Sequence, residues 1–171
     1  MNETIKTLTT RRSPRAFRPE HVSKEDIQEI IAAGLNAPSG MNSQSPRFVV
    51  VQDDAMVQKL SKMNAAVMGM PADPFYGAPD VIVVLAVKQM TYIYDGSLAM
   101  GNLLNAAWSK GIDSRWIHRA KEVFESEEGK QLLKEWGITE DVEGIGFCIL
   151  GYAAEEKSPK EIKEGRVYYV S

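Results

Sequence analysis

The sequence predicts one α+β domain in which helices flank a central sheet of mixed or antiparallel strands. Helical and strand patterns alternate irregularly along the 171 residues, whereas a parallel sheet is built from regular βα repeats. No Gly-x-Gly-x-x-Gly motif follows a strand and opens a helix, so a dinucleotide-binding doubly wound domain is not supported. The nearly continuous apolar run at residues 81–87 is typical of a strand covered on both faces. We therefore place this strand at the centre of the sheet.

Two helices are predicted at the start of the chain. The first is short and covers about residues 4–10, with its apolar residues on one side. The second begins after Ser23, a good N-cap residue, and Asp26 follows three positions later. Its apolar residues recur at helical spacing, and it should stop by Pro38 because proline disfavours continuation of a helix.

A strand, a helix and a loop are predicted next. The β-branched run at residues 48–51 indicates a short strand, after which Asp53 or Asp54 caps a helix that reaches about Met63. Residues 69–79 contain three prolines and two glycines and therefore form a loop. Irregular segments often carry binding surfaces, so this loop is a plausible wall of an active site.

The second half of the chain opens with a helix at residues 95–110. Apolar residues cover nearly its whole circumference, so it is predicted to be buried in the core or at a subunit contact, and Gly111 ends it. The later elements are a strand at residues 113–117, a charged helical segment up to Trp136, a strand at residues 144–152, and a short apolar strand at residues 167–170 within the polar tail, residues 157–171.

Composition places the chain among ordinary globular proteins. Residues 1–171 fit one domain with a sizeable core, since 44% of them are hydrophobic and 25% are charged. The net charge of -3 argues against nucleic-acid binding, which depends on attraction to phosphates. The first ten residues do not read as a secretory signal, and no stretch reaches the ~18 apolar residues of a membrane helix. We therefore expect a soluble protein with no membrane partner.

Other chemistries receive no support from the residues. The single cysteine, Cys148, lies in an apolar run and is predicted to be a buried structural thiol, for which a reducing cytoplasm is the simplest setting. His21 and His118 are isolated from each other, so no metal centre is predicted. A Gly-x-Ser-x-Gly elbow is absent, so a Ser-His-Asp hydrolase has no positive indication.

A dense basic cluster stands near the amino terminus. The arginine segment, residues 11–15, contains Arg11, Arg12, Ser13 and Arg15. Guanidinium groups grip phosphate through paired hydrogen bonds, so this segment is suited to hold an anion. Short basic runs are also common on protein surfaces, and on its own the segment is equally compatible with a solvated turn.

Two later features decide between these interpretations. The polar loop, residues 38–44, offers Pro38, Ser39, Asn42 and Gln44, and further basic residues stand near the C-terminus at Lys163 and Arg166. In order and approximate separation, the three features resemble the nitroreductase family of FMN enzymes across essentially the whole chain. That family opens with Arg-(Arg or His)-Ser-x-(Arg or Lys), continues with a Pro-Ser-x-x-Asn-x-Gln loop and ends with basic residues that return to the phosphate.

The resemblance implies a nitroreductase-like α+β sandwich and assigns roles to the basic residues. Arg11 and Ser13 match the positions that hold the phosphate and ribityl chain, and Arg15 matches a position near flavin N1 and O2, where a cation favours the reduced, anionic ring. Lys163 or Arg166 would close over the phosphate. Arg12 is left with two possible partners, the phosphate or a structural carboxylate.

The resemblance also implies a homodimer with shared sites. Ser39 and Asn42, in the loop that includes Pro38 and Gln44, match positions that approach the flavin from the neighbouring subunit, and the tail strand is expected to be exchanged between subunits. Backbone groups of the loop before the last core strand are expected to face the flavin near N5, here Val142, Glu143 and Gly144.

The chemistry implied is hydride transfer from NADH or NADPH to flavin N5, followed by delivery to an electron-poor small molecule such as a nitroaromatic or quinone in a ping-pong sequence. No catalytic side chain is expected, because the cofactor performs the difficult step. The alternatives are a flavin-binding or redox-sensing protein without turnover and an anion-binding module.

The chain departs from the family pattern at Pro46, which stands where many members carry a large aromatic residue. The acceptor wall is expected from residues 68–76 or from the segment after Trp116.

Overall fold

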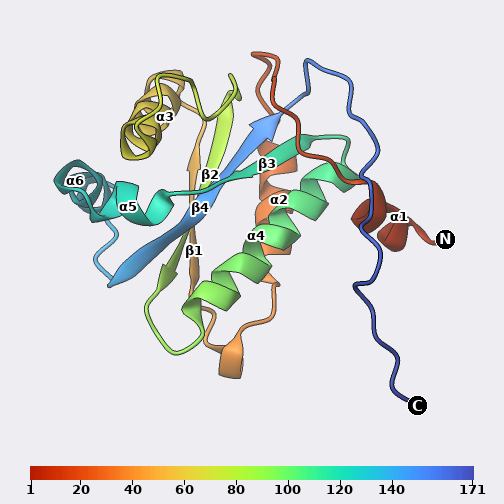
Figure 1. The fold of residues 1–171 in the computed structure, drawn as a ribbon. Helices are drawn as coiled ribbons and strands as arrows, with labels where there is room; N and C mark the ends of the chain where they lie inside the picture. Colours follow the sequence, from red (N-terminus) through yellow and green to blue (C-terminus); the bar gives the residue numbers. More distant parts are fainter.

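The computed structural model describes all residues from 1 to 171 and contains a four-stranded sheet (Figure 1). Its strands are β1 (Pro46–Val51), β2 (Asp80–Val87), β3 (Asp113–Ile117) and β4 (Val142–Gly151), in the spatial order β1-β2-β4-β3. Every neighbouring pair is antiparallel, so the sheet is antiparallel and not mixed. β2 lies between β1 and β4, which confirms its predicted place inside the sheet.

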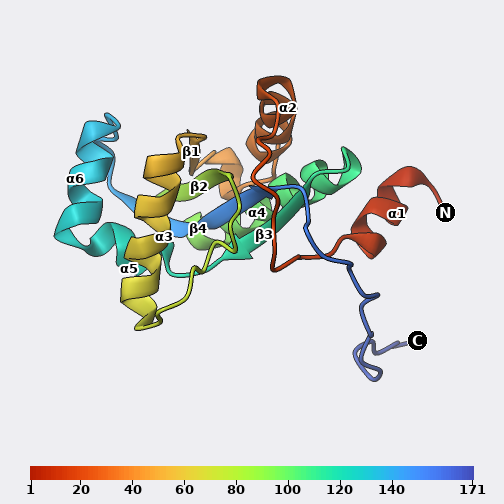
Figure 2. The same cartoon turned by 90° about the horizontal axis from the view of Figure 1, so that it is seen from above.

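Helices cover both faces of this sheet (Figure 2). One face carries α2 (Lys24–Leu35) and α4 (Tyr92–Ser109), and the other carries α3 (Asp54–Met68), α5 (Ala120–Glu125) and α6 (Glu127–Glu135). The short α1 (Glu3–Thr10) lies near the C-terminal end of α4. Successive side chains of β2 point to opposite faces, so alternate residues of this one strand enter two separate buried clusters.

Local signals place the helix starts well and the helix ends less well. Ser23 caps α2 as predicted, because its side chain accepts a hydrogen bond from the backbone N–H of Asp26. The third helix runs past the predicted Met63 to Met68 and ends at Gly69, whose φ of 61° is the left-handed conformation that glycine adopts at little cost. The charged segment up to Trp136 forms two helices, α5 and α6, and not one.

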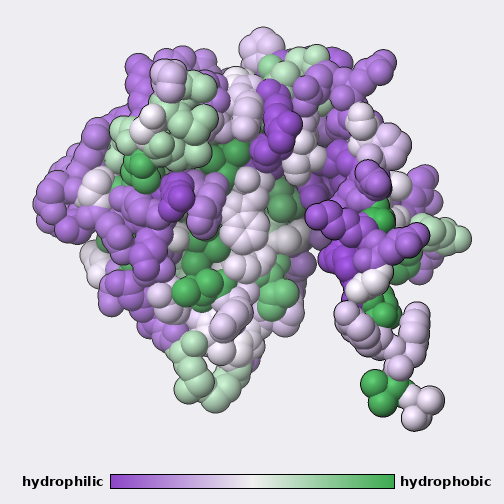
Figure 3. Space-filling view, in the orientation of Figure 1, coloured by the Kyte–Doolittle hydropathy of each residue, from purple (hydrophilic) through white to green (hydrophobic).

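The tail runs past α1 and away from the rest of the molecule (Figure 1). Residues 157–171 form no helix or strand, so the strand predicted at residues 167–170 is not formed within one chain. Its apolar side chains are exposed, from 68% for Val167 to 99% for Val170. Figure 3 shows the tail standing clear of the body with apolar surface at its end. No helix has the length and apolar character that a bilayer crossing requires.

Candidate functional site

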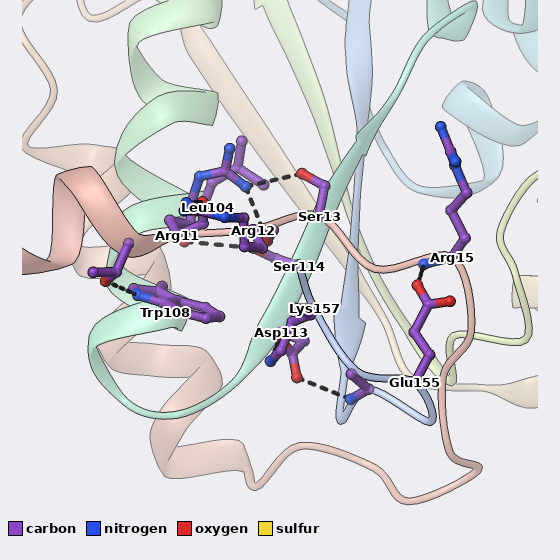
Figure 4. A network of polar contacts seen from close by, with 12 residues as sticks. Arg11, Arg12, Ser13, Arg15, Leu104, Trp108, Asp113, Ser114, Glu155 and Lys157 are labelled. Atoms are coloured by element: carbon purple, nitrogen blue, oxygen red, sulfur yellow. Dashed lines mark hydrogen bonds and ion pairs between the residues drawn. The ribbon is translucent and has the colours of Figure 1, made fainter. Parts of the chain in front are cut away.

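The arginine segment holds two adjacent guanidinium groups without a carboxylate partner (Figure 4). Arg11 is half-buried and donates hydrogen bonds to the Ser13 hydroxyl (2.9 Å) and to the Arg12 carbonyl (3.1 Å). Burial, and then the neighbouring charge of Arg12, lowers the pKa of Arg11 below its ordinary value. None of the ion pairs in the chain includes Arg11, Arg12 or Arg15. Burial and the Arg12 charge both disfavour the charged form of Arg11, and an anion bound here would stabilise it.

Arg12 binds backbone carbonyl groups and connects the two ends of the chain. Its Nε donates to the carbonyl of Ser158 (3.0 Å), and one terminal nitrogen donates to the carbonyls of Thr9 (3.2 Å) and Arg11 (2.8 Å). The suggestion of a structural carboxylate partner for Arg12 is therefore wrong. Instead, Arg12 fixes the start of the tail beside the arginine segment.

Arg15 lies at the other end of the segment and is exposed. Its backbone N–H donates to the side chain of Glu155, and its guanidinium points away from the Arg11–Ser13 pair in Figure 4. A second arginine, Arg115 on β3, was not recognised in the sequence. It donates to the Ser13 carbonyl (3.0 Å) and its guanidinium lies 5.1 Å from the centroid of the Tyr76 ring. Arg115 therefore joins three parts of the chain that are remote in sequence.

The polar loop lies beside the opposite, N-terminal end of α4 (Figure 1). Pro38, Asn42 and Gln44 are exposed, while Ser39 is half-buried. The Ser39 hydroxyl accepts a hydrogen bond from the Gln44 N–H (3.0 Å), and the Gln44 side-chain amide donates to the Asn42 side-chain oxygen (3.2 Å). These bonds give the loop a defined shape and leave its outer surface open to a partner.

The arginine segment and the polar loop cannot border one site within a single chain. Helix α4 has 18 residues and is therefore about 27 Å long. The Thr10 hydroxyl, next to the arginine segment, accepts from the Trp108 indole at one end of this helix, and the Gly40 N–H donates to Asp95 at the other. Within one chain, the two groups therefore lie at opposite ends of α4.

Comparisons with known proteins cover the residues that carry these motifs. A model of the nitroreductase family matches residues 8–74, which include the arginine segment and the polar loop. A protein of Archaeoglobus fulgidus, provisionally named NADH dehydrogenase/NAD(P)H nitroreductase, is 34% identical over 164 residues, covering 92% of this chain and 89% of that protein. The chain belongs to the nitroreductase family.

Two solved structures share the whole fold. A nitroreductase with bound FMN from Bacteroides fragilis has a TM-score of 0.92 and 27% identity, and one from Desulfitobacterium hafniense, also with bound FMN, has a TM-score of 0.90 and 29% identity. Each comparison covers 100% of both chains. The α+β sandwich expected for a nitroreductase is therefore confirmed.

Other residues that the nitroreductase resemblance singled out lie elsewhere. Val142, Glu143 and Gly144 begin β4 itself and pair with β2, so Val142 and Glu143 belong to the strand and not to a loop before it. Gly144 is covered by α5, since a Cβ there would lie 2.4 Å from the Ala120 carbonyl. These residues pair with β2 on one side only, because β3 pairs with Phe147–Gly151, and their expected contact with the flavin stays a prediction.

Lys163 and Arg166 do not reach the arginine segment in the single chain. Both are exposed, and neither makes a side-chain hydrogen bond or ion pair within the chain. The tail is nevertheless held close by at Ser158, and the five residues from there to Lys163 can extend by about 17 Å. The expected contact of Lys163 or Arg166 with a phosphate therefore stays a prediction.

A hollow of about 630 Å³ separates α3 from part of the expected acceptor wall. Pro71, Ala72, Asp73 and Phe75 line it, but none of the predicted FMN-binding residues does. A second hollow of about 340 Å³ lies along β1 and the end of α2, and its lining includes Leu35, Phe48 and Val50. The first is of a size that accepts small molecules.

Proposed function

We propose that this nitroreductase-family member is an FMN-dependent oxidoreductase that passes hydride from NADH or NADPH to an electron-poor small molecule, such as a nitroaromatic or quinone, by a ping-pong sequence. The supporting observation is the half-buried Arg11, which stands beside Arg12 with no carboxylate to neutralise it. Both solved relatives described above contain FMN, whose phosphate is an anion of the right kind for such a cluster.

The residues of the arginine segment fit this cofactor. Arg11 and the exposed Ser13 hydroxyl would hold the phosphate and the ribityl chain, with Lys163 or Arg166 of the tail closing over the phosphate. Arg15 would serve the ring edge, where its charge favours the reduced flavin. When bound, FMN supplies an N5 atom that accepts a hydride and later gives it up.

The protein's own share of this reaction is binding and orientation. No side chain need act as a nucleophile, and Cys148 is unsuited to that role because burial raises the pKa of its thiol to about 12. The polar loop, with its half-buried Ser39 and exposed Asn42, would face the flavin ring from the partner subunit. Holding donor and acceptor in turn against one ring face is the positioning that the fold must supply.

We propose that the active form is a homodimer, because each chain carries only half of the contacts. Helix α4 presents an uncovered side, on which Tyr94 and Leu98 are exposed and a Cβ added at Gly101 would meet no atom within 4 Å. Large exposed apolar side chains beside a glycine permit close approach of a second helix. Packing of two such sides would place the polar loop of one chain near the arginine segment of the other.

The exposed end of the tail is proposed to complete the dimer by adding a strand to the partner's β1. The sheet has two edges, β1 and β3, and β3 is already flanked by the arginine segment through the Arg115–Ser13 bond. The β1 edge is bordered by the apolar hollow that Leu35 and Val50 line. An added strand gains main-chain hydrogen bonds and buries alternate side chains, which suits residues 167–170.

An absorption spectrum of the purified protein, recorded anaerobically after FMN is added and excess removed, tests the proposal. The protein is expected to be yellow, to bleach on addition of NADH or NADPH, and to regain colour with a quinone or nitroaromatic. Failure to retain FMN would refute the proposal. Retained FMN that neither nicotinamide reduces would indicate a flavin-binding protein without turnover.

A further inference from the structure

The carboxylate of Asp95, in the first turn of α4, collects an unusual number of donors. It is 2% exposed and lies directly behind the polar loop. Its Oδ1 accepts from the Gly40 N–H (2.9 Å), and its Oδ2 accepts from Ser43 Oγ (2.9 Å), Ser45 Oγ (2.8 Å), Gln89 Nε2 (2.7 Å) and Thr91 Oγ1 (3.2 Å). Four of the five donors therefore converge on Oδ2, while Oδ1 accepts the Gly40 N–H alone.

This negative charge is held without a cation. No lysine, arginine or histidine forms an ion pair with Asp95. Burial raises the pKa of Asp95, but hydrogen bonds from the Gly40 N–H and from the hydroxyls of Ser45, Ser43 and Thr91 outweigh it, so the pKa lies below its ordinary value. The positive end of the α4 dipole adds to this stabilisation. Asp95 is therefore ionised at neutral pH.

The loop that Asp95 holds has a conformation it would not keep by itself. Met41, Asn42 and Gln44 all have positive φ angles, of 50°, 55° and 48°, which side chains other than glycine adopt only at a cost. Gly40 lies so close to the start of α4 that a Cβ would be 2.3 Å from the Thr91 hydroxyl. Such strain persists only where surrounding contacts fix the backbone. Bonds between Ser39, Asn42 and Gln44 shape the loop from within, and Asp95 ties it to the start of α4 through Gly40 and Ser43.

We propose that Asp95 is a positioning residue of the flavin site, which holds the polar loop in the shape that carries Ser39 and Asn42 to the cofactor of the partner subunit. This inference rests on the proposed function. Asp95 itself lies behind the loop and takes no part in the chemistry. Its effect on the flavin passes through the Gly40 N–H and the Ser43 and Ser45 hydroxyls.

The test compares Asp95→Asn with Asp80→Asn, a matched control. Asp80 is also buried, at 0% exposed, and accepts from His21, the Val22 N–H and Gln52, but it lies beside α2 and not beside the polar loop. Each asparagine keeps the size of the side chain and converts one acceptor oxygen into a donor. Asp95→Asn is expected to raise the Kd for FMN at least tenfold, while Asp80→Asn lowers the melting temperature and changes the Kd less than twofold.

Two further readouts separate positioning from general stability. Hydrogen exchange of the apo protein should be faster at residues 38–45 in Asp95→Asn and unchanged there in Asp80→Asn. The visible circular dichroism of bound FMN should change only in Asp95→Asn. Should that variant not fold, Ser43→Ala replaces it, with a smaller rise in Kd and the same local loss of exchange protection expected.

The outcomes distinguish this inference from the function on which it rests. If the wild type takes up no FMN, both are refuted. If the wild type binds FMN and Asp95→Asn binds it within twofold as tightly, with unchanged exchange at residues 38–45, only the role of Asp95 is refuted. Equal loss of FMN affinity in both variants would likewise show that Asp95 acts through stability alone.

Discussion

Replacing Arg11 by alanine tests the cofactor site most simply. Arg11 is half-buried, as is Arg12, and the only hydrogen bonds of its guanidinium are to the Ser13 hydroxyl and the Arg12 carbonyl. The variant removes the charge that faces the proposed phosphate. It also removes the repulsion between neighbouring guanidinium groups that helps to lower the pKa of Arg11. The free protein should therefore keep nearly its original melting temperature.

The magnitude follows from the kind of contact that is lost. A hydrogen bond to a charged group contributes about 1.5–3 kcal/mol, and each 1.4 kcal/mol corresponds to a tenfold change in affinity. The Kd for FMN should therefore rise about ten- to hundredfold. The partial burial of Arg11 reduces screening by salt, so the loss should persist at moderate ionic strength.

Quenching of flavin fluorescence during titration with protein measures this Kd, at matched pH and salt. Arg18→Ala is the matched control. Arg18 lies just beyond the arginine segment, is exposed, and its side chain makes no hydrogen bond or ion pair. The control should bind FMN as the wild type does. An Arg11→Ala Kd within twofold of the wild type would show that Arg11 does not contact the phosphate.

Three further predictions follow from the packing of the chain. The hydrogen bond from His21 to Asp80 raises the pKa of His21, so its stabilising effect is full below the ordinary value of about 6.5 and is lost as pH rises through the raised pKa. Melting temperatures of wild type and His21→Gln should thus differ at pH 5.5 and converge by pH 8.5; a constant difference would contradict this. Deleting residues 160–171 should weaken FMN binding and shift the protein toward monomer in analytical ultracentrifugation, and an unchanged dimer would count against tail exchange. Gly144→Ala should lower the free energy of unfolding in urea by about 1–3 kcal/mol, because its Cβ would meet the Ala120 backbone, and an unchanged midpoint would contradict the packing.

Sequence patterns predicted those parts of the fold that depend on neighbours along the chain. The Ser23 cap and the continuous apolar character of β2 are local signals, and both elements appear where expected. The end of α3 was missed because Gly69 was assigned to the following loop and not to the helix terminus. Errors of this kind move a boundary by a few residues and leave the topology intact.

Contacts between distant segments could not be predicted in the same way. Arg115 was read only as a strand residue, and its bond to the Ser13 carbonyl depends on where the arginine segment crosses β3. Asp95 was read only as the start of a helix, although its partners Gly40, Ser43 and Ser45 lie about 50 residues earlier, in the polar loop and directly after it. Val142 and Glu143 were left outside the strand predicted at residues 144–152, because pairing with β2 is a long-range choice that no local motif records.

The shared site is tested most directly by combining two differently damaged chains in one dimer. One chain carries Arg11→Ala and Ser13→Ala, the other carries Ser39→Ala and Asn42→Ala, and distinct affinity tags isolate the mixed dimer. If each flavin contacts the arginine segment of one chain and the polar loop of the other, the mixed dimer regains one FMN site of wild-type affinity while both parent dimers bind weakly. A mixed dimer in which both sites remain weak would contradict a site built from two chains.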